Sequence, residues 1–219
     1  MLQPTPAQCE YAARCRDDFG FCAANELQIV DEDANTRYLD TLYPPQAALL
    51  QCILDDFAIG RPSRNIVLKA RRHGISTLVA ALYFWLCAFR ENLSALIITD
   101  KKEDAAPLFR MHQRFWDGLS PFLQPEKGTD RETKMRFRDF GSEIAIRWAG
   151  SALKRVGNAQ GAAGVGRGDR FSLVHFSEWA HYPNGSDLYR AVKIALSKRP
   201  GTVFVGESTA NGMSGHFHE

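Results

Sequence analysis

The segment 69–77 combines basic side chains, one glycine and two hydroxyl groups, and it follows a short apolar stretch. It reads Lys-Ala-Arg-Arg-His-Gly-Ile-Ser-Thr. A strand that runs into a glycine turn and then a helix can bind a phosphate chain, and the usual loop pattern is G-x-x-x-x-G-K-S/T. Gly74 and Ser76 fit this pattern, but Lys69 stands where the first Gly is usual and Ile75 stands where the Lys is usual. The sequence thus predicts a phosphate-binding loop whose cation comes from its front end.

Each position of this loop has a chemical reason. Backbone N–H groups at a helix start wrap an anion, and a glycine removes the Cβ that would block the phosphate. A Lys stem reaches β- and γ-phosphate oxygens from either end of the loop, and the Ser76 hydroxyl suits Mg²⁺. The alternative is a basic strand–helix turn that holds no ligand. We expect the nucleotide-binding residues to be Lys69, Ala70, Arg71, Arg72, His73, Gly74, Ile75, Ser76 and Thr77.

A second group lies at the end of a later apolar segment, 173–178, which reads Leu-Val-His-Phe-Ser-Glu. In NTPases with such loops, this strand tip carries an Asp that holds Mg²⁺ and a group that positions the attacking water. Here Ser177 occupies the Asp position and could hold Mg²⁺ weakly or through a water. Glu178 is expected to orient and deprotonate the attacking water. A Glu that caps the following turn is the alternative, and His175 is interpreted as structural.

A third group follows the last apolar segment and reads Glu-Ser-Thr-Ala-Asn-Gly over 207–212. Small hydroxyl and amide groups at a strand tip could sense a γ-phosphate and relay its loss to movement. The residues in this coupling role would be Ser208, Thr209, Asn211 and Gly212. Taken alone, the stretch is better explained as an ordinary polar turn, and its interest comes from the two groups before it.

These groups need strands and helices that alternate along the chain. Such alternation is typical of an α/β fold with a mostly parallel sheet, whose ligands bind at the carboxyl ends of the strands. The helix after the loop is apolar almost all round and should be buried, and residues 135–149 should form a β-hairpin around Gly141. We expect strands at 65–69, 95–99, 171–176 and 202–206, and helices at 46–59, 76–90, 103–119 and 186–199.

The composition limits the class of protein. With 219 residues, 45% of them hydrophobic, the chain can bury a real core. Its formal net charge of +2 is nearly neutral, so any nucleic-acid contact has to come from local patches. The longest apolar run, 78–89, is too short to cross a bilayer, and the N-terminus lacks a signal-peptide pattern. The five cysteines form no C-x-x-C pair, which favours reduced thiols over a zinc site.

Four segments in this order and spacing, KARRHGIST, GVGRGDRF, LVHFSEWA and GESTANG, resemble the ATPase part of the large terminase subunit of tailed bacteriophages and prophages. The resemblance covers roughly residues 40–215. It implies a P-loop NTPase fold of the ASCE type, a three-layer sandwich with a mostly parallel central sheet and an inserted β-hairpin, and it implies ATP and Mg²⁺ as cofactors. The family includes members with the loop Lys at the start of the motif and members with Ser-Glu at the second motif. Tyr43-Pro44-Pro45-Gln46 is similar to its adenine-contacting segment, so the resemblance implies that Gln46 contacts adenine.

The resemblance also implies a biological role, which is ATP hydrolysis that drives double-stranded viral DNA into a preformed capsid. The implied partners are double-stranded DNA, the portal protein, the terminase small subunit and further copies of the chain in a ring on the portal. The implied location is the host cytoplasm, with no place in the virion or in a membrane. In such rings an arginine from one subunit reaches the γ-phosphate of its neighbour. Arg167 matches the candidate position, with a solvated loop charge as its other interpretation, and Arg71 is the alternative within the same subunit.

The chain is expected to divide into an N-terminal extension on the adenine side, 1–45, and a P-loop ATPase core, 46–219. Full-length family members carry a C-terminal nuclease with an acidic metal-binding cluster. The residues after Gly212 leave no room for that fold. The sequence is therefore interpreted as C-terminally truncated, and no nuclease activity is expected from it.

Two other functions fit parts of the sequence. A helicase-like DNA translocase would use the same ATPase chemistry, but it would carry helicase motifs on a second domain, which this sequence does not contain. A non-catalytic module that binds DNA or proteins with a degenerate, empty loop is supported by Ile75 and Ser177, both losses relative to the common motifs. Nucleotide binding in the presence of Mg²⁺ would separate the ATPase from the empty module.

Overall fold

The computed structural model describes residues 4–128, 133–152, 170–212 and 217. Its centre is a six-stranded sheet with the order β3-β8-β7-β4-β6-β5, in which all pairs are parallel except β5 with β6. The expected mostly parallel α/β fold is therefore confirmed, and the predicted hairpin forms one edge of the sheet. The strands are β3 (Ser63–Leu68), β4 (Ser94–Thr99), β5 (Lys134–Phe137), β6 (Ser142–Trp148), β7 (Leu173–Ser177) and β8 (Val203–Ser208).

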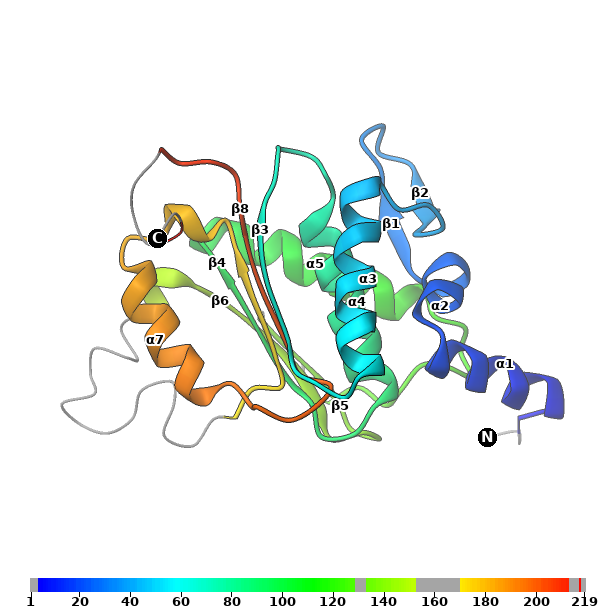
Figure 1. The fold of residues 1–219 in the computed structure, drawn as a ribbon. Helices are drawn as coiled ribbons and strands as arrows, with labels where there is room; N and C mark the ends of the chain where they lie inside the picture. The colour runs from blue at the N-terminus through cyan, green and yellow to red at the C-terminus, as the bar shows by residue number, and fades with distance from the viewer. Residues whose placement is uncertain (1–3, 129–132, 153–169, 213–216, 218–219) are drawn as a thin grey trace.

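Helices cover both faces of this sheet and give the three layers (Figure 1). On one face lie α3, α4 and α5, and on the other lies α7 with the short 3₁₀ helix η2. Because the crossovers between parallel strands run through these helices, both faces of the central strands are buried. The helices are α3 (Pro44–Ala58), α4 (Ile75–Phe89), α5 (Lys102–Gly118), η2 (Trp179–His181) and α7 (Gly185–Ala195).

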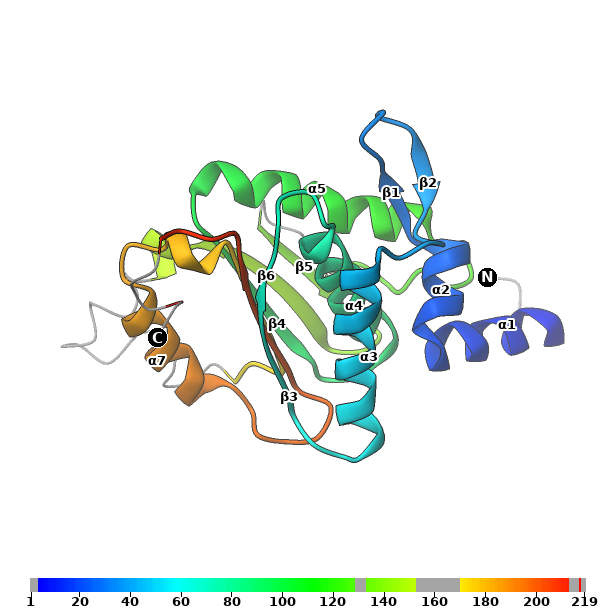
Figure 2. The same ribbon diagram turned by 45° about the horizontal axis from the view of Figure 1, so that its top comes forward.

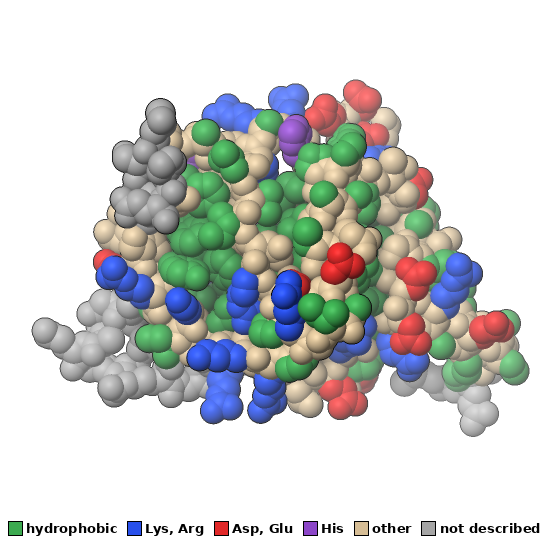
Figure 3. Space-filling view, in the orientation of Figure 1, with side chains coloured by type: hydrophobic (Ala, Val, Ile, Leu, Met, Phe, Trp, Pro, Cys, Tyr) green, Lys and Arg blue, Asp and Glu red, His purple; other side chains and the backbone are tan. Residues whose placement is uncertain are grey.

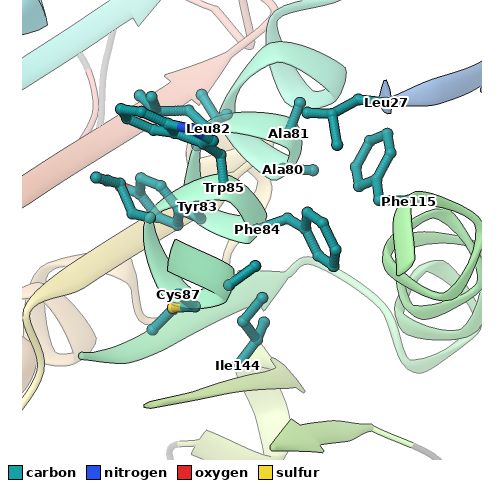
Figure 4. Packing of buried hydrophobic residues seen from close by; sticks show 14 of the residues in the cluster. Leu27, Ala80, Ala81, Leu82, Tyr83, Phe84, Trp85, Cys87, Phe115 and Ile144 are labelled. Atoms are coloured by element: carbon teal, nitrogen blue, oxygen red, sulfur yellow. The ribbon is translucent and has the colours of Figure 1, made fainter. Parts of the chain in front are cut away.

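The apolar helix α4 fills the centre of the larger core. Its residues from Leu78 to Phe89 are all buried, as expected for a helix that is apolar all round. The Phe84 ring packs against Phe115 of α5, with ring centroids 5.5 Å apart (Figure 4). The Tyr83 hydroxyl donates a hydrogen bond to the Val174 carbonyl of β7 at 2.7 Å. These contacts fix α4, and with it the loop that precedes it, against the sheet.

The N-terminal part, which the sequence left without assigned elements, contains helices α1 (Pro6–Asp17) and α2 (Phe19–Glu26) and strands β1 (Gln28–Val30) and β2 (Thr36–Tyr38). The two strands form a separate antiparallel hairpin (Figure 2). Trp85 of α4 donates a hydrogen bond to the Cys15 carbonyl at 2.7 Å, so α1 shares the core of the sheet domain. The division at residue 45 falls inside α3, and the two-part organisation stays a prediction.

The expected helix at 186–199 is too long at its C-terminal end. Helix α7 ends at Ala195, because Leu196 turns to an extended conformation and pairs with Phe171 in a parallel β-bridge. Ser197 then donates its backbone N–H to the Phe171 carbonyl at 2.8 Å. Phe171, where the expected strand at 171–176 starts, forms only this isolated bridge, and β7 begins at Leu173. None of the helices in the described ranges combines the length and apolar character that a bilayer span requires.

Candidate functional site

The three groups predicted from the sequence meet at the carboxyl ends of three neighbouring strands. The strands β3, β8 and β7 are neighbours and run parallel, so their carboxyl ends lie together (Figure 1). The register pairs Leu68 with Ser208 and Ser177 with Glu207. The loop after β3, the acid after β7 and the polar stretch at the end of β8 are therefore adjacent in space, although they come from distant parts of the chain.

The Lys69 side chain lies between two carboxylates at these strand ends. Its Nζ is 2.8 Å from Glu178 Oε1 and 3.1 Å from Glu207 Oε2, and only 9% of the side chain is exposed. Burial alone would lower the pKa of Lys69, but the charges of Glu207 and Glu178 raise it above its usual value. The two carboxylates therefore favour the charged form of the amine and hold it at the start of the loop 69–77.

Glu178 follows β7 in a left-handed backbone conformation, with φ of 59°, which is uncommon for a residue other than glycine. Its Oε2 accepts hydrogen bonds from the backbone N–H and the hydroxyl of Thr209, at 3.1 and 3.0 Å. Burial alone would raise the pKa of Glu178, but the hydrogen bonds from Lys69 and the Thr209 amide outweigh it and lower the pKa. His181, which the sequence did not single out, lies 3.4 Å from the Thr209 hydroxyl.

Glu207 is the site residue that the sequence reasoning missed. It is fully buried, and its Oε1 accepts hydrogen bonds from Ser76 Oγ at 2.7 Å and Ser177 Oγ at 2.9 Å. His175 Nε2 lies 3.3 Å from the same oxygen, so this strand histidine belongs to the site's surroundings. Burial alone would raise the pKa of Glu207, but His175, Lys69 and Ser76 together lower it to about 2. The sequence contained one signal for this residue, which is a carboxylate directly after the apolar segment 203–206.

The loop has the geometry expected of a helix start. Gly74 stands at the N-cap position of α4 with a left-handed backbone, φ of 66°, and as a glycine it supplies no side-chain hydrogen bond to the helix start. The first backbone N–H groups of α4 have no partner within the helix, which suits an anion. Ile75 is buried in the core, so this position cannot supply the usual cation. The expected transfer of the cation to Lys69 therefore has a structural reason.

Gln46 lies directly behind this loop. Its Nε2 donates a hydrogen bond to the Gly74 carbonyl at 2.8 Å, and its Oε1 accepts one from the Tyr43 backbone N–H at 2.8 Å. A Cβ on residue 74 would come within 2.6 Å of the Gln46 amide nitrogen, so the glycine is needed for space as well as conformation. Gln46 thus positions the loop here, and its contact with adenine stays a prediction.

The remaining predicted residues are four positions of the loop, Thr77 of α4 and Arg167. Arg71 and Arg72 are exposed on the loop, and Arg72 has a left-handed backbone with φ of 63°. Ala70 is exposed as well, whereas His73 and Thr77 are half-buried. Arg167 lies outside the described residues, so the choice between Arg167 and Arg71 as finger stays open.

The polar stretch after β8 is tied to the segment that carries Glu178. Ser208 Oγ accepts a hydrogen bond from the Ala180 backbone N–H at 3.2 Å, and Asn211 Nδ2 donates one to the Ala180 carbonyl at 3.0 Å. Gly212 closes the stretch with a φ of 81°. Residues 208–212 are therefore connected by hydrogen bonds to the segment that follows Glu178.

The oxygens next to the loop fit a hard divalent cation. The described part of the chain has no group of three His, Cys, Asp or Glu side chains arranged for a metal ion. A P-loop Mg²⁺ needs few protein ligands, since nucleotide phosphates and water supply the others. The Ser76 hydroxyl, with its proton directed to buried Glu207, provides an oxygen of the required kind. Ser177 offers a second hydroxyl in the same position relative to Glu207.

No protein-family model matches the sequence, and no curated protein matches it either. Among solved structures, the HK97 bacteriophage large terminase superimposes with a TM-score of 0.61 at 15% identity, over 90% of this chain and 37% of that protein. The large terminase ATPase domain of Thermus phage P74-26 gives a TM-score of 0.54 at 17% identity, over 98% of this chain and 72% of that domain. The chain has the fold of phage large terminase ATPase domains.

The strand order of this fold positions the site. With β8 between β3 and β7, the sheet places a third strand end between the loop 69–77 and Glu178. The chain spans 37% of the length of the HK97 large terminase. A cavity of about 160 Å³ lined by Arg64, Tyr189 and Phe204 also exists, but it lies at the opposite end of β3 from Lys69.

Proposed function

We propose that this chain is the ATPase domain of a phage terminase large subunit, and that it hydrolyses ATP to move double-stranded viral DNA into a capsid. The observation that carries the proposal is the position of Lys69. Its amine lies 2.8 Å from the Glu178 carboxylate and beside the uncapped start of α4. A phosphate-binding cation, a helix start and an acid thus surround one point in a terminase-like fold.

In this mechanism Lys69 and the backbone N–H groups of 71–77 bind the β- and γ-phosphates. Exposed Arg71 adds positive charge on the same loop. The finger is either Arg167, supplied by a neighbouring subunit, or Arg71 of the same subunit. Phosphoryl transfer to water depends chiefly on positioning and on neutralising charge that spreads over the phosphate oxygens. The chain's own contribution is therefore a rigid cradle, which Gln46 and Gly74 hold in shape.

Glu178 is the group that accepts the proton of the attacking water. Before nucleotide binds, the Lys69 hydrogen bond holds its pKa low, which makes it a weak base. When Lys69 turns to the phosphates, that hydrogen bond is lost, while burial and the nearby Glu207 charge continue to raise the pKa. Nucleotide binding thus converts Glu178 into a stronger base at the time when it is needed.

Mg²⁺ would be held at Ser76, with Ser177 close by, and when bound it neutralises charge on the phosphate oxygens. The coupling residues are Ser208, Thr209 and Asn211. Thr209 binds Glu178 directly, so a change in the charge or position of Glu178 alters its two hydrogen bonds with Thr209. We infer that this connection passes γ-phosphate loss to the segment 208–212.

The partners of the proposed motor are double-stranded DNA, the portal protein and the terminase small subunit. The chain would act as one member of a ring on the portal, in the host cytoplasm and outside the finished virion. The likeness of the fold to the HK97 and P74-26 terminases supports this assignment. If Arg167 is the finger, a neighbouring copy in the ring would bring it to the site.

The test is the rate of ATP hydrolysis without DNA, with single-stranded DNA and with double-stranded DNA. We expect Mg²⁺-dependent hydrolysis that double-stranded DNA increases, lost in Lys69→Ala and kept in Lys102→Ala, which removes an exposed lysine at the start of α5. Stronger stimulation by single-stranded DNA would favour a helicase-like translocase. A wild-type chain that neither binds nor hydrolyses millimolar ATP would instead be the empty module.

A further inference from the structure

Because Ser177 stands where an Asp is usual, β7 supplies no carboxylate for Mg²⁺ at this position of the proposed site. In P-loop NTPases the loop Ser or Thr shares its Mg²⁺ with an Asp on a nearby strand. Here the strand β7 ends in Ser177, Glu178 follows it, and the Ser177 hydroxyl carries no charge. The two oxygens of Glu178 contact Lys69 and Thr209. A carboxylate next to Ser76 therefore has to come from another strand.

Glu207 of β8 has the required position. β8 lies between β3 and β7, and its register places Glu207 opposite Ser177. Glu207 Oε1 accepts the hydroxyl protons of Ser76 at 2.7 Å and of Ser177 at 2.9 Å. Both hydroxyl protons are thereby directed to the carboxylate, which leaves the lone pairs of Ser76 Oγ for a cation.

The charges around Lys69 support the same role. One ammonium faces two carboxylates, Glu178 at 2.8 Å and Glu207 at 3.1 Å. Among the described residues, Glu207 Oε2 has no hydrogen-bond partner besides this ion pair. When Lys69 turns to the phosphates, Glu207 Oε2 loses its cation, while Oε1 keeps His175 and the two serine hydroxyls. A fully buried carboxylate that loses a charge partner is costly. A divalent cation beside Ser76 restores the balance of charge.

The structure assigns to Glu207 the carboxylate that P-loop NTPases usually carry at the Ser177 position for Mg²⁺. This inference rests on the proposed ATPase function and adds a residue to it. Glu207 is a positioning residue, since it orients the Ser76 hydroxyl and offers its charge from β8 instead of β7. Compared with the common motifs, the acid that supports the metal thus stands on the neighbouring strand, and the loop cation stands at the other end of the loop.

The test compares the affinity for a fluorescent ATP analogue in Mg²⁺ with the affinity in EDTA. Glu207→Gln keeps the size of the side chain and removes its charge. We expect the factor by which Mg²⁺ tightens binding to fall at least about tenfold, as for other residues that orient metal ligands. Metal-free binding should stay the same or strengthen, because a negative charge is gone. An equal loss with and without Mg²⁺ would show a merely structural role and overturn the inference.

A rescue variant separates charge from folding. Ser177→Asp in the Glu207→Gln background returns a carboxylate to the register position opposite residue 207. We expect this double variant, checked for folding by circular dichroism, to regain the Mg²⁺ effect and the binding of Mn²⁺ seen by electron paramagnetic resonance. A folded double variant without recovery contradicts the inference.

Two further controls close the experiment. If Glu207→Gln does not fold, the same titration is carried out on Glu207→Asp. The shorter side chain draws the carboxylate away from Ser76, so the Mg²⁺ effect should weaken. An unchanged Mg²⁺ effect in Glu207→Asp overturns the inference. A folded Glu207→Gln that keeps the full Mg²⁺ effect overturns it as well, while the wild type still binds ATP. A wild type that binds no ATP in Mg²⁺ or EDTA instead removes the proposed function, and the inference with it.

Discussion

At the scale of single residues, the charges of three side chains define the site. The Lys69 ammonium lies between the carboxylates of Glu178 and Glu207, and each carboxylate also accepts hydrogen bonds from other groups. Lys69, Ser76 and Glu178 could be singled out from the sequence, because Lys69 and Glu178 each follow an apolar strand and Ser76 follows a glycine at a helix start. Glu207 was not predicted, because its role depends on which strand lies next to β7, and the sequence does not reveal strand order.

Lys69→Ala should destabilise the fold in the absence of nucleotide. The substitution leaves Glu207 buried with one charge partner fewer, and loss of one member of a buried ion pair costs about 3 kcal/mol. Glu178→Gln should cost less than about 1 kcal/mol, since the Glu178 side chain is 35% exposed and solvent screens its charge. Urea unfolding of both variants and of Lys102→Ala measures these differences. A Lys69→Ala variant as stable as Lys102→Ala would show that the pair contributes little to the fold.

At the scale of elements, periodicity and capping signals were sufficient for α4, α5, β4 and the β5–β6 hairpin. These segments have strong patterns, and their ends differ from the expectation by a residue or two. The end of α7 was misplaced because a tertiary β-bridge, Phe171 with Leu196, competes with the helix. The N-terminal helices were missed because their apolar residues contact distant partners, such as Trp85 with Phe19.

Helix α5 carries a buried histidine that should make stability depend on pH. Burial lowers the pKa of His112 from 6.5 to about 4. Since the unfolded chain takes up a proton at higher pH than the native chain, stability is greatest above pH 6.5 and is lost as pH falls towards 4. The loss amounts to roughly 3 kcal/mol.

Urea unfolding at pH 7 and at pH 4.5 checks this expectation against a variant. In His112→Leu, the part of the acid sensitivity that comes from this ring should disappear, while the contribution of the carboxyl groups stays. The wild type should therefore lose more stability than the variant between the two pH values. Equal losses in both proteins would mean that His112 is protonated in the native state.

At the scale of the whole molecule, β3 forms one edge of the sheet in the described part of the chain. Its outward side chains Ile66 and Leu68 are 64% and 68% exposed. Hydrophobic side chains gather on this face between α7 and α3, with Lys and Arg side chains below them (Figure 3). An exposed apolar edge strand is a template for pairing with another chain.

Ile66→Lys should therefore reduce self-association of this chain. A charged side chain on an edge strand discourages pairing between sheets. Static light scattering over a range of protein concentrations measures the effect, and we expect a lower apparent mass for the variant at high concentration. Ile194→Lys is the matched control, because Ile194 is 81% exposed on α7 and lies on no strand edge. Equal effects of both substitutions would assign the association to general hydrophobicity and not to the β3 edge.

In the proposed mechanism, nucleotide draws the Lys69 amine from Glu178 to the phosphates and leaves Glu178 as the base for the attacking water. The most direct test of this mechanism is a paired measurement of Mg²⁺-ATP binding and of ATP turnover for the wild type and Glu178→Gln. We expect the variant to bind ATP about as tightly as the wild type and to turn it over roughly 10²–10⁴ times more slowly, the usual contribution of a general base. Wild-type turnover in Glu178→Gln, or a wild-type chain that does not bind ATP, would contradict this mechanism.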